Sequence, residues 1–348
     1  MASRTIAAGS KQAFMIDCDG KPWVWGKLNW GEVEPTQFPT DCSFRSVYCG
    51  INTGFLIDMD SQLWEYGAAP TQIYQKMELP PIKAVATYSE SSLFLDTESN
   101  VWVLGINYYG QLGLGTTIRC EIPRKIENLP TITAVAAGHS HSLFLDNCNA
   151  VWCCGSNSCG ELGIKSYENL MTPAKVAYLP PIGSLCAGFF VSYFLDLEGN
   201  VWSCGKNTTG QQGLGKSDRD KAEQIAFSQA NVFITSVATG FDHALFLDSQ
   251  EKVWGCGSSL DGQLQDIKCW IWEPVQLALE GLKICEIAAG DHFSVFMDTE
   301  GKIWTRGKNQ SGQLGRREVG CGGIGQVEGI ALAALKNFSR VKSARGAQ

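Results

Sequence analysis

The sequence predicts an all-β fold, a seven-bladed β-propeller whose blades are four-stranded antiparallel sheets. The first observation is a repeat in which an aspartate is followed six residues later by a tryptophan and, three residues after that, by a glycine. The second is the period, because successive tryptophans lie 38 to 52 residues apart, a spacing typical of propeller blades. The third is the content of each repeat, in which short apolar runs alternate with glycine-rich turns. The repeated residues are Asp17, Asp58, Asp96, Asp146, Asp196, Asp248 and Asp298, then Trp23, Trp64, Trp102, Trp152, Trp202, Trp254 and Trp304, then Gly26, Gly67, Gly105, Gly155, Gly205, Gly257 and Gly307. Residues 1–348 are therefore predicted to form a single propeller domain.

The fourth repeat shows how one blade is expected to form. Residues 132–138 end in small side chains, which suit the crowded innermost strand beside the propeller axis. Residues 142–145 form the second strand, and residues 146–150 have the composition of a tight turn. Residues 151–154 form the third strand, and a fourth is expected near residues 173–176. Each repeat thus contains four short strands, which is one blade.

The repeated side chains are expected to be structural. The aspartate caps the turn with its side chain, and the tryptophan ring packs as a wedge between neighbouring sheets. The third position after the aspartate favours a positive φ. The residues at that position are Gly20, Gly199, Gly301 and Asn149, which fit it well, and Ser61, Ser99 and Glu251, which fit it less well. An array of seven separated aspartates does not suit paired acid–base catalysis.

Composition narrows the classes of function. The chain has 44% hydrophobic and 18% charged residues, and its net charge of −7 argues against direct binding to nucleic acid or chromatin. The first residues lack the apolar core of a signal peptide, and no apolar run approaches the ~18 residues that a membrane span needs. The fourteen cysteines show no repeated pairing spacing, and three of them occupy one repeat position, where they are expected to be small buried hydrophobes (Cys154, Cys204 and Cys256). The expected compartment is reducing, either cytoplasm or nucleus.

These residues resemble the regulator of chromosome condensation repeat family. The resemblance rests on the pattern Asn-Val-Trp-x-x-Gly-x-Asn-x-x-Gly-Gln-Leu-Gly at residues 100–113, with close echoes at 200–213 and 302–315. It covers about residues 5–315 and implies a seven-bladed propeller. Members of the family include nucleotide-exchange factors for Ran-type small GTPases, nucleosome-docking proteins, light sensors, enzyme inhibitors and recognition domains of ubiquitin ligases. The fold alone does not choose among these functions.

Departures from the family patterns argue against some of these functions for this chain. Plant UV-B photoreceptors of the family carry Gly-Trp-Arg-His-Thr after the inner strand, whereas residues 138–141 read Gly-His-Ser-His. The exchange factors carry an inserted β-wedge in one blade, and the tryptophan spacing here leaves no place for a long insertion. We expect no ubiquitin-ligase catalytic domain, because none is recognised after the repeats in residues 316–348.

The loops between the first and second strands are the expected functional surface. Seven such loops surround one mouth of the axis, and they contain all four histidines. We expect no cofactor, no metal site and no catalytic group, because the histidines belong to different repeats and the Gly-x-Asn loops recur as turns rather than as phosphate loops. The residues predicted to contact a protein partner are His139, His141, Phe189, Phe190, Phe241, Asp242, His243, Asp291 and His292, together with an extra aromatic pair in the sixth repeat, Trp270 and Trp272.

Two further departures carry structural expectations. The second repeat lacks the outer glycine loop after Gly67, and Tyr88 replaces the inner glycine of the third repeat, so a notch is predicted between these blades. The tail, residues 316–348, echoes an inner strand at 338–341 and is predicted to close the ring.

The sequence thus favours a non-catalytic propeller that binds a protein through one face. A regulator of a small GTPase, of the guanine-nucleotide exchange type, is the specific form of this hypothesis. The alternatives are an architectural protein that uses the propeller as a rigid disc and an inhibitor that plugs an enzyme with its loops.

Overall fold

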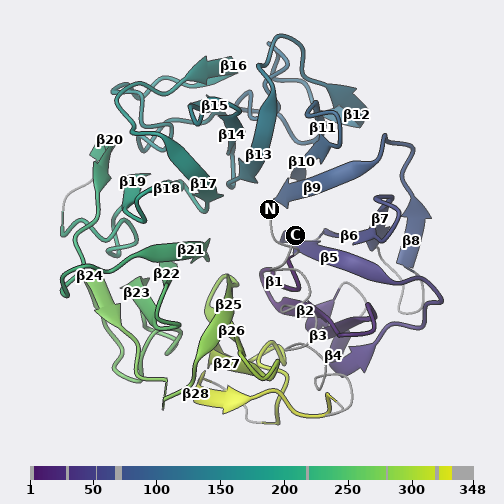
Figure 1. The fold of residues 1–348 in the computed structure, drawn as a ribbon, viewed down its shortest axis with the longest axis vertical. Helices are drawn as coiled ribbons and strands as arrows, with labels where there is room; N and C mark the ends of the chain where they lie inside the picture. The colour runs from purple at the N-terminus through teal and green to yellow at the C-terminus, as the bar shows by residue number, and fades with distance from the viewer. Residues whose placement is uncertain are drawn as a thin grey trace.

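The computed structural model describes residues 4–28, 31–51, 53–66, 73–216, 219–279, 281–317 and 321–330. These residues form seven four-stranded antiparallel sheets arranged around a central axis (Figure 1). In every sheet the strands lie in chain order from the axis outward, so each blade is one continuous segment. The predicted all-β, seven-bladed propeller is confirmed. Among the described residues there is no helix that is long and apolar enough to cross a membrane.

The strand bounds follow the predicted repeat. The innermost strands are β1 (Ile6–Ala8), β5 (Phe44–Cys49), β9 (Ile82–Thr87), β13 (Ile132–Ala137), β17 (Ile182–Ala187), β21 (Ile234–Thr239) and β25 (Ile284–Ala289). The second strands are β2 (Gln12–Ile16), β6 (Gly54–Asp58), β10 (Ser91–Asp96), β14 (His141–Asp146), β18 (Val191–Asp196), β22 (His243–Asp248) and β26 (Phe293–Asp298). The third strands are β3 (Pro22–Leu28), β7 (Leu63–Tyr66), β11 (Val101–Gly105), β15 (Val151–Gly155), β19 (Val201–Gly205), β23 (Val253–Ser258) and β27 (Ile303–Lys308). The outermost strands are β4 (Gly31–Gln37), β8 (Ile73–Lys76), β12 (Cys120–Lys125), β16 (Leu170–Lys175), β20 (Arg219–Gln224), β24 (Trp270–Gln276) and β28 (Cys321–Gln326).

The hydrophobic core lies between blades rather than inside any one of them. Every second strand is buried along its whole length, whereas outer strands such as β12 and β16 are largely exposed. The buried side chains form seven clusters, each shared by two adjacent blades. Since burial of apolar surface drives folding, each blade depends on its two neighbours.

The repeated aspartate holds the turn and the third strand together. In the fourth blade, Asp146 Oδ1 accepts the backbone N–H groups of Cys148 (2.8 Å) and Ala150 (2.9 Å). Its Oδ2 accepts the indole N–H of Trp152 at 2.9 Å. The same indole–carboxylate bond occurs in all seven blades, at 2.7–3.0 Å. Burial opposes the charged form of Asp146, but these hydrogen bonds outweigh it and lower the pKa of the carboxyl.

The structure confirms two further predictions about the repeat. The third position after each aspartate has a positive φ of 60–84° in all seven blades, including those with Ser61, Ser99 and Glu251. Each tryptophan ring packs into the core cluster that its blade shares with the preceding blade, and six of the rings are only partly buried. The aspartate is therefore a cap for the turn and also the anchor for the wedge.

The first and last blades meet through a packed seam. Trp25, which is additional to the seven repeated tryptophans, is fully buried there and donates its indole N–H to the carbonyl of Gln313 at 3.0 Å. Glu286 accepts the backbone N–H groups of Thr5 (2.9 Å) and Ile6 (3.1 Å) across the same seam.

Within the predicted tail, β28 is the outer strand of the seventh blade. The remainder, residues 331–348, lies outside the described residues, so its ring-closing role stays a prediction.

The aspartate anchor can be tested directly. We expect Asp146→Ala to lower the free energy of unfolding by about 2–4 kcal/mol, because three donors lose their acceptor at a buried position. Asp60→Ala, a change at an exposed turn position, is the matched control and is expected to alter stability by less than about 0.5 kcal/mol. Urea unfolding followed by tryptophan fluorescence measures both variants. Equal losses of unfolding free energy in the two variants would show that the aspartate does not anchor the turn and the tryptophan.

Candidate functional site

The loops between the first and second strands lie on the same face of the ring as the loops between the third and fourth strands. In the fourth blade, the N–H of Ser156, after the third strand, donates to the carbonyl of Ser140, between the first and second strands, at 2.8 Å. The sixth blade repeats this contact from Ser258 to Asp242 at 2.8 Å. We call this side the loop face, and the opposite side, which carries the aspartate turns, the turn face.

Backbone hydrogen bonds join the inner loops of successive blades around the mouth of the axis. The N–H of His139 donates to the carbonyl of Gly188 in the next blade at 3.1 Å. The N–H of Phe241 donates to the carbonyl of Asp291, and the N–H of Asp291 donates to the carbonyl of Gly9, each at 3.3 Å. The last bond crosses from the seventh blade to the first. The inner loops are therefore fixed relative to one another, and their side chains are presented on a rigid frame.

Aromatic side chains from five consecutive blades form a continuous arc on this frame. The ring centroids lie 6.5 Å apart for Tyr88 and His139, and 4.7 Å for His139 and Phe189. The arc continues from Phe189 to Phe241 at 4.1 Å and from Phe241 to His292 at 5.7 Å. All five side chains are half-buried. We call these five residues the aromatic arc.

Phe190 supports the arc from the side. Its ring lies 4.6 Å from that of Phe189 and 5.3 Å from that of His139. Its backbone has a φ of 58°, a left-handed conformation that is costly for a bulky side chain. Phe189 and Phe190 both pack against the ring of His139, and this packing offsets the local strain.

Tyr88 covers the mouth instead of leaving a notch. Its hydroxyl donates to the carbonyl of Gly240, three blades away, at 3.3 Å. Its own carbonyl accepts the N–H of Ile51 in the second blade at 2.6 Å. The predicted notch is therefore wrong at Tyr88, because the side chain that replaces the glycine reaches across the mouth. The other half of that prediction, residues 67–72, lies outside the described residues. The replacement of the repeated glycine singled out Tyr88 in the sequence. The contact of its side chain with Gly240 could not be deduced from that replacement.

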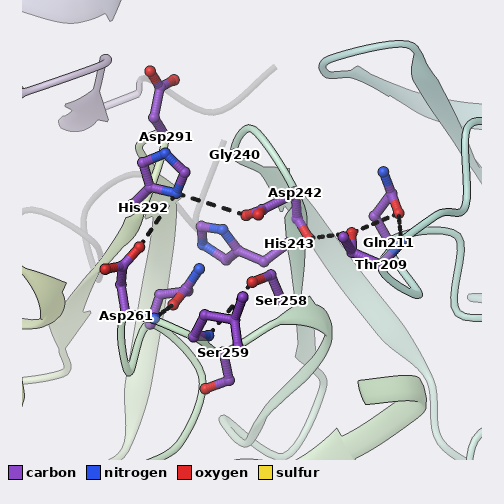
Figure 2. A network of polar contacts seen from close by, with 12 residues as sticks. Thr209, Gln211, Gly240, Asp242, His243, Ser258, Ser259, Asp261, Asp291 and His292 are labelled. Atoms are coloured by element: carbon purple, nitrogen blue, oxygen red, sulfur yellow. Dashed lines mark hydrogen bonds and ion pairs between the residues drawn. The ribbon is translucent and has the colours of Figure 1, made fainter. Parts of the chain in front are cut away.

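Carboxylates flank the arc at the sixth and seventh blades (Figure 2). His292 Nδ1 lies 3.6 Å from Asp261 Oδ2 and 3.9 Å from Asp242 Oδ1. Asp242 Oδ1 is buried and has no hydrogen-bond partner among the described residues. Burial raises the pKa of the Asp242 carboxyl, and the nearby His292 opposes that rise. The backbone carbonyl of Asp242 accepts the hydroxyl of Thr209 at 3.3 Å, which helps to fix the loop.

We call His292 with Asp242 and Asp261 the carboxylate corner. Asp291, the residue before His292, contacts the first blade instead. Its Oδ2 accepts the hydroxyl of Ser10 at 2.6 Å, across the seam between the seventh and first blades. Asp291 is half-buried and lies beside His292 in the chain, but its carboxylate points away from Asp242 and Asp261 (Figure 2).

Two of the predicted contact residues belong to the packing between blades. His141 and His243 are 1% and 0% exposed, and their Nε2 atoms lie 2.9 Å from Ser192 Oγ and 3.1 Å from Ser294 Oγ in the following blades. Their Nδ1 atoms are buried without a partner within the described residues. Burial lowers the pKa of each imidazole to about 3. Neither side chain is available to a partner, because the alternation of a strand turns both of them inward.

Trp270 and Trp272 lie away from the arc. Both belong to β24, the outermost strand of the sixth blade (Figure 1). Their rings are nearly perpendicular at 6.2 Å, Trp270 is 50% exposed, and Lys216 Nζ lies 5.8 Å from the Trp272 ring. The structure does not join this pair to the mouth. It remains a separate prediction of a contact surface at the rim.

The three cysteines at one repeat position are buried, as expected, and each also makes a polar contact. Cys154 Sγ lies 3.5 Å from the carbonyl of Gln111, and Cys256 Sγ lies 3.4 Å from the carbonyl of Gln211, in the preceding blades. Within the described residues, no three histidine, cysteine, aspartate or glutamate side chains are grouped so that they could hold a metal ion. The arrangement at the mouth is suited to binding through ring faces and carboxylates.

The fold and the mouth define a seven-bladed β-propeller with a rigid, aromatic loop face. One model of the regulator of chromosome condensation (RCC1) repeat matches residues 98–145 and 198–247, and a second model of that repeat matches residues 132–161, 234–263 and 284–313. These matches identify RCC1 repeats in the chain, within a seven-bladed propeller.

Solved structures share this architecture at low sequence identity. Human WBSCR16 is 19% identical with a TM-score of 0.74, over 86% of this chain and 85% of that chain. Prp20p from Saccharomyces cerevisiae, whose structure is described together with its binding to Gsp1p and histones, is 19% identical with a TM-score of 0.73, over 84% and 81%. Yeast RCC1 (Prp20) in a structure with Kap60 is 18% identical with a TM-score of 0.78, over 94% and 85%. Identities at this level show a shared fold. No curated protein matches the chain in sequence.

The two buried histidines predict a sensitivity to acid. In the unfolded chain their pKa is about 6.5, whereas in the fold it is about 3, so acid favours the unfolded chain from pH 6.5 downward. Each histidine is expected to remove up to about 1.4 kcal/mol of stability per pH unit in this window. The double variant His141→Gln/His243→Gln, which copies Gln12 of the first blade, is expected to lose this dependence. Urea unfolding between pH 7.5 and 5 measures the slope, with the single variants expected to lie halfway. An unchanged slope in the double variant would contradict the assignment.

The carboxylate corner predicts two opposite pKa changes. His292→Gln is expected to raise the pKa of Asp242 further, because it removes a neighbour that favours the ionised carboxylate. Asp261→Asn is expected to lower the same pKa, because it removes a negative charge that opposes ionisation. Carbon-13 NMR titration of labelled aspartate carboxyl groups measures both. If the pKa of Asp242 shifted in the same direction in both variants, His292 and Asp261 would not have the opposite effects on Asp242 that we describe.

Proposed function

We propose that this chain is a non-catalytic protein-binding propeller and that its loop face docks the partner. The observation that carries the proposal is the aromatic arc, in which half-buried rings from five blades meet beside the carboxylate corner. Clustered aromatic residues in a fixed frame are typical of the energetic centre of a protein interface.

Comparison between the blades supports this surface. The residue after the inner glycine position is not fixed by the repeat, since it is serine, isoleucine, histidine, phenylalanine or aspartate, and the arc uses His139, Phe189 and Phe241 from it. The aspartate and tryptophan of the same blades are invariant and are engaged with each other. Residues that are repeated seven times maintain the ring, whereas residues that vary on one rigid face can distinguish partners.

The polar groups around the arc favour a partner with mixed charge. Lys206 Nζ lies 5.3 Å from the ring of Phe189 on one side. Asp242, Asp261 and Asp291 lie at the other end of the arc. Charges at the rim of an aromatic patch set the orientation and the association rate of a partner more than its affinity.

Regulation of a small GTPase is the specific form of the proposal. The description of Prp20p with Gsp1p motivates it for this fold. The loops between third and fourth strands have 11 to 14 residues in the third, fourth and sixth blades, and among the described residues no such loop contains the inserted β-wedge expected of an exchange factor. Exchange activity is therefore the part of the hypothesis with the least structural support, and binding of a protein is the part with the most.

Partner capture tests the docking surface. We expect Phe189→Ala/Phe241→Ala to reduce recovery of the specific partner at least tenfold, because it removes the centre of the arc. Tyr178→Ala is the matched control, since Tyr178 is an 82% exposed aromatic residue on the connection from β16 to β17, at the turn face. Immobilised full-length protein, with quantitative mass spectrometry of retained proteins, compares the variants with wild type. Thermal unfolding verifies that both fold. If the double variant and the control retain the same proteins in the same amounts, the loop face is not the docking surface.

A separate assay tests the GTPase hypothesis. Release of labelled GDP from a panel of small GTPases is measured with micromolar wild-type protein. Acceleration that the Phe189→Ala/Phe241→Ala variant loses would support regulation through the arc. No acceleration of any GTPase would discard exchange activity and would leave the capture experiment to decide between docking and a purely architectural disc.

A further inference from the structure

The axis of the propeller encloses a channel that the docking proposal does not use. It has a volume of about 1340 Å³ and is lined by residues of the innermost strands. Figure 1 shows these strands around the axis. At the loop face it contacts Tyr88, Gly240 and Asp291. The bond from Tyr88 to Gly240 partly closes that end. The channel is larger than most small-molecule sites, which have roughly 300–1,000 Å³, so a compact ligand would occupy only part of it. With the loop-face end partly closed, that ligand would enter from the turn face.

The turn-face mouth of this channel carries a cluster of positive charge. Arg4, Arg45 and Lys83 line it and occupy one equivalent repeat position in three consecutive blades. We call these residues the basic crescent. In the next four blades the equivalent residues are uncharged side chains or glycine (Thr133, Gly183, Thr235 and Cys285). The chain as a whole has a net charge of −7, so three cations at one side of one opening give this region a charge opposite to that of the whole protein.

The crescent keeps an excess of positive charge, because three cations share this end of the channel with one carboxylate. Within the part of the chain that the structure describes, none of the three cations forms an ion pair. Glu286 is the carboxylate that lines this end of the channel, and it is engaged with the backbone N–H groups of Thr5 and Ile6. Its hydrogen bonds belong to the seam between blades. The cations therefore remain available to an anion.

Arg45 is held ready to bind an anion. Its Nη2 donates to Ser61 Oγ at 3.1 Å and to the carbonyl of Ile82 at 2.8 Å, which fixes the guanidinium at the channel wall. Its Nε is buried and has no hydrogen-bond partner among the described residues. A buried donor without an acceptor is costly, and a fixed guanidinium suits the oxygens of phosphate groups.

We propose that the basic crescent binds a small polyanion that carries phosphate groups at the turn-face mouth of the channel. Three cations in one opening match a ligand with several negative charges better than a single carboxylate. Asp291, at the opposite end, repels such a ligand and keeps it near the turn face. The site lies on the other face from the aromatic arc, so a ligand there can be bound together with a protein partner.

Titration calorimetry with inorganic triphosphate tests the site in the full-length protein. Wild type is expected to bind it, with an affinity that falls as salt is raised. Arg45→Gln/Lys83→Gln is expected to weaken binding at least tenfold. Arg4→Gln/Lys83→Gln, which leaves the hydrogen bonds of Arg45 in place, is expected to do the same and guards against a folding defect in the first variant. The matched control is Arg124→Gln/Lys125→Gln on the exposed strand β12, which removes the same charge and is expected to bind as wild type does.

Three results would overturn the proposal. The first is the absence of triphosphate binding to wild type at low salt. The second is an equal loss of binding in the control, which would show a response to overall charge. The third is tighter binding of an oligoglutamate peptide than of triphosphate, which would assign the crescent to acidic protein segments. Inositol hexakisphosphate, compared with triphosphate, distinguishes a phosphorylated organic ligand from a free phosphate chain, and selective binding of either one supports the site.

Discussion

The architecture depends on one interaction, the triple hydrogen bond of the repeated aspartate to the turn backbone and to the tryptophan six residues later. It closes the turn between the second and third strands and fixes the indole ring against the preceding blade. Because the interaction recurs in every blade, the seven sheets are set at equivalent positions around the axis. The core is formed between blades, so the ring is stable only when these wedges are all in register. The loops at the opposite ends of the strands consequently come together at one mouth.

This repetition separates the structural residues from those available for function. The aspartates bond to the tryptophans, and the asparagines of the outer glycine loops bond within their own loops, so these repeated residues leave little for a ligand. At the mouth, by contrast, the side chains vary among the blades of a common frame, and Tyr88, Phe189 and Phe241 form a surface that no single repeat could make. The turn face shows the same principle with charge. One repeat position is basic in three blades and uncharged in the other four, which gives a symmetrical ring an asymmetrical opening.

The sequence was sufficient for the features that recur. The blade number, the strand order, the positive φ at Ser99 and Glu251, and the common face of the inner loops all follow from seven aligned copies. It was insufficient where a side chain contacts a distant blade. Tyr88 meets Gly240, and Trp25 meets Gln313, because the ring closes, and no local pattern records that closure. The inward orientation of His141 and His243 was also missed, since their loops appear exposed until the strand alternation fixes which side chains point between blades.

The central claim is that variation on the loop face, carried by a fixed ring, selects a protein partner. Amide hydrogen exchange of the full-length protein, alone and with its captured partner, measures where that partner binds. The account predicts added protection in residues 88–91, 139–141, 189–191, 241–243 and 291–292, with little change in the aspartate turns such as residues 146–150. Protection confined to those turns or to the outermost strands would contradict it.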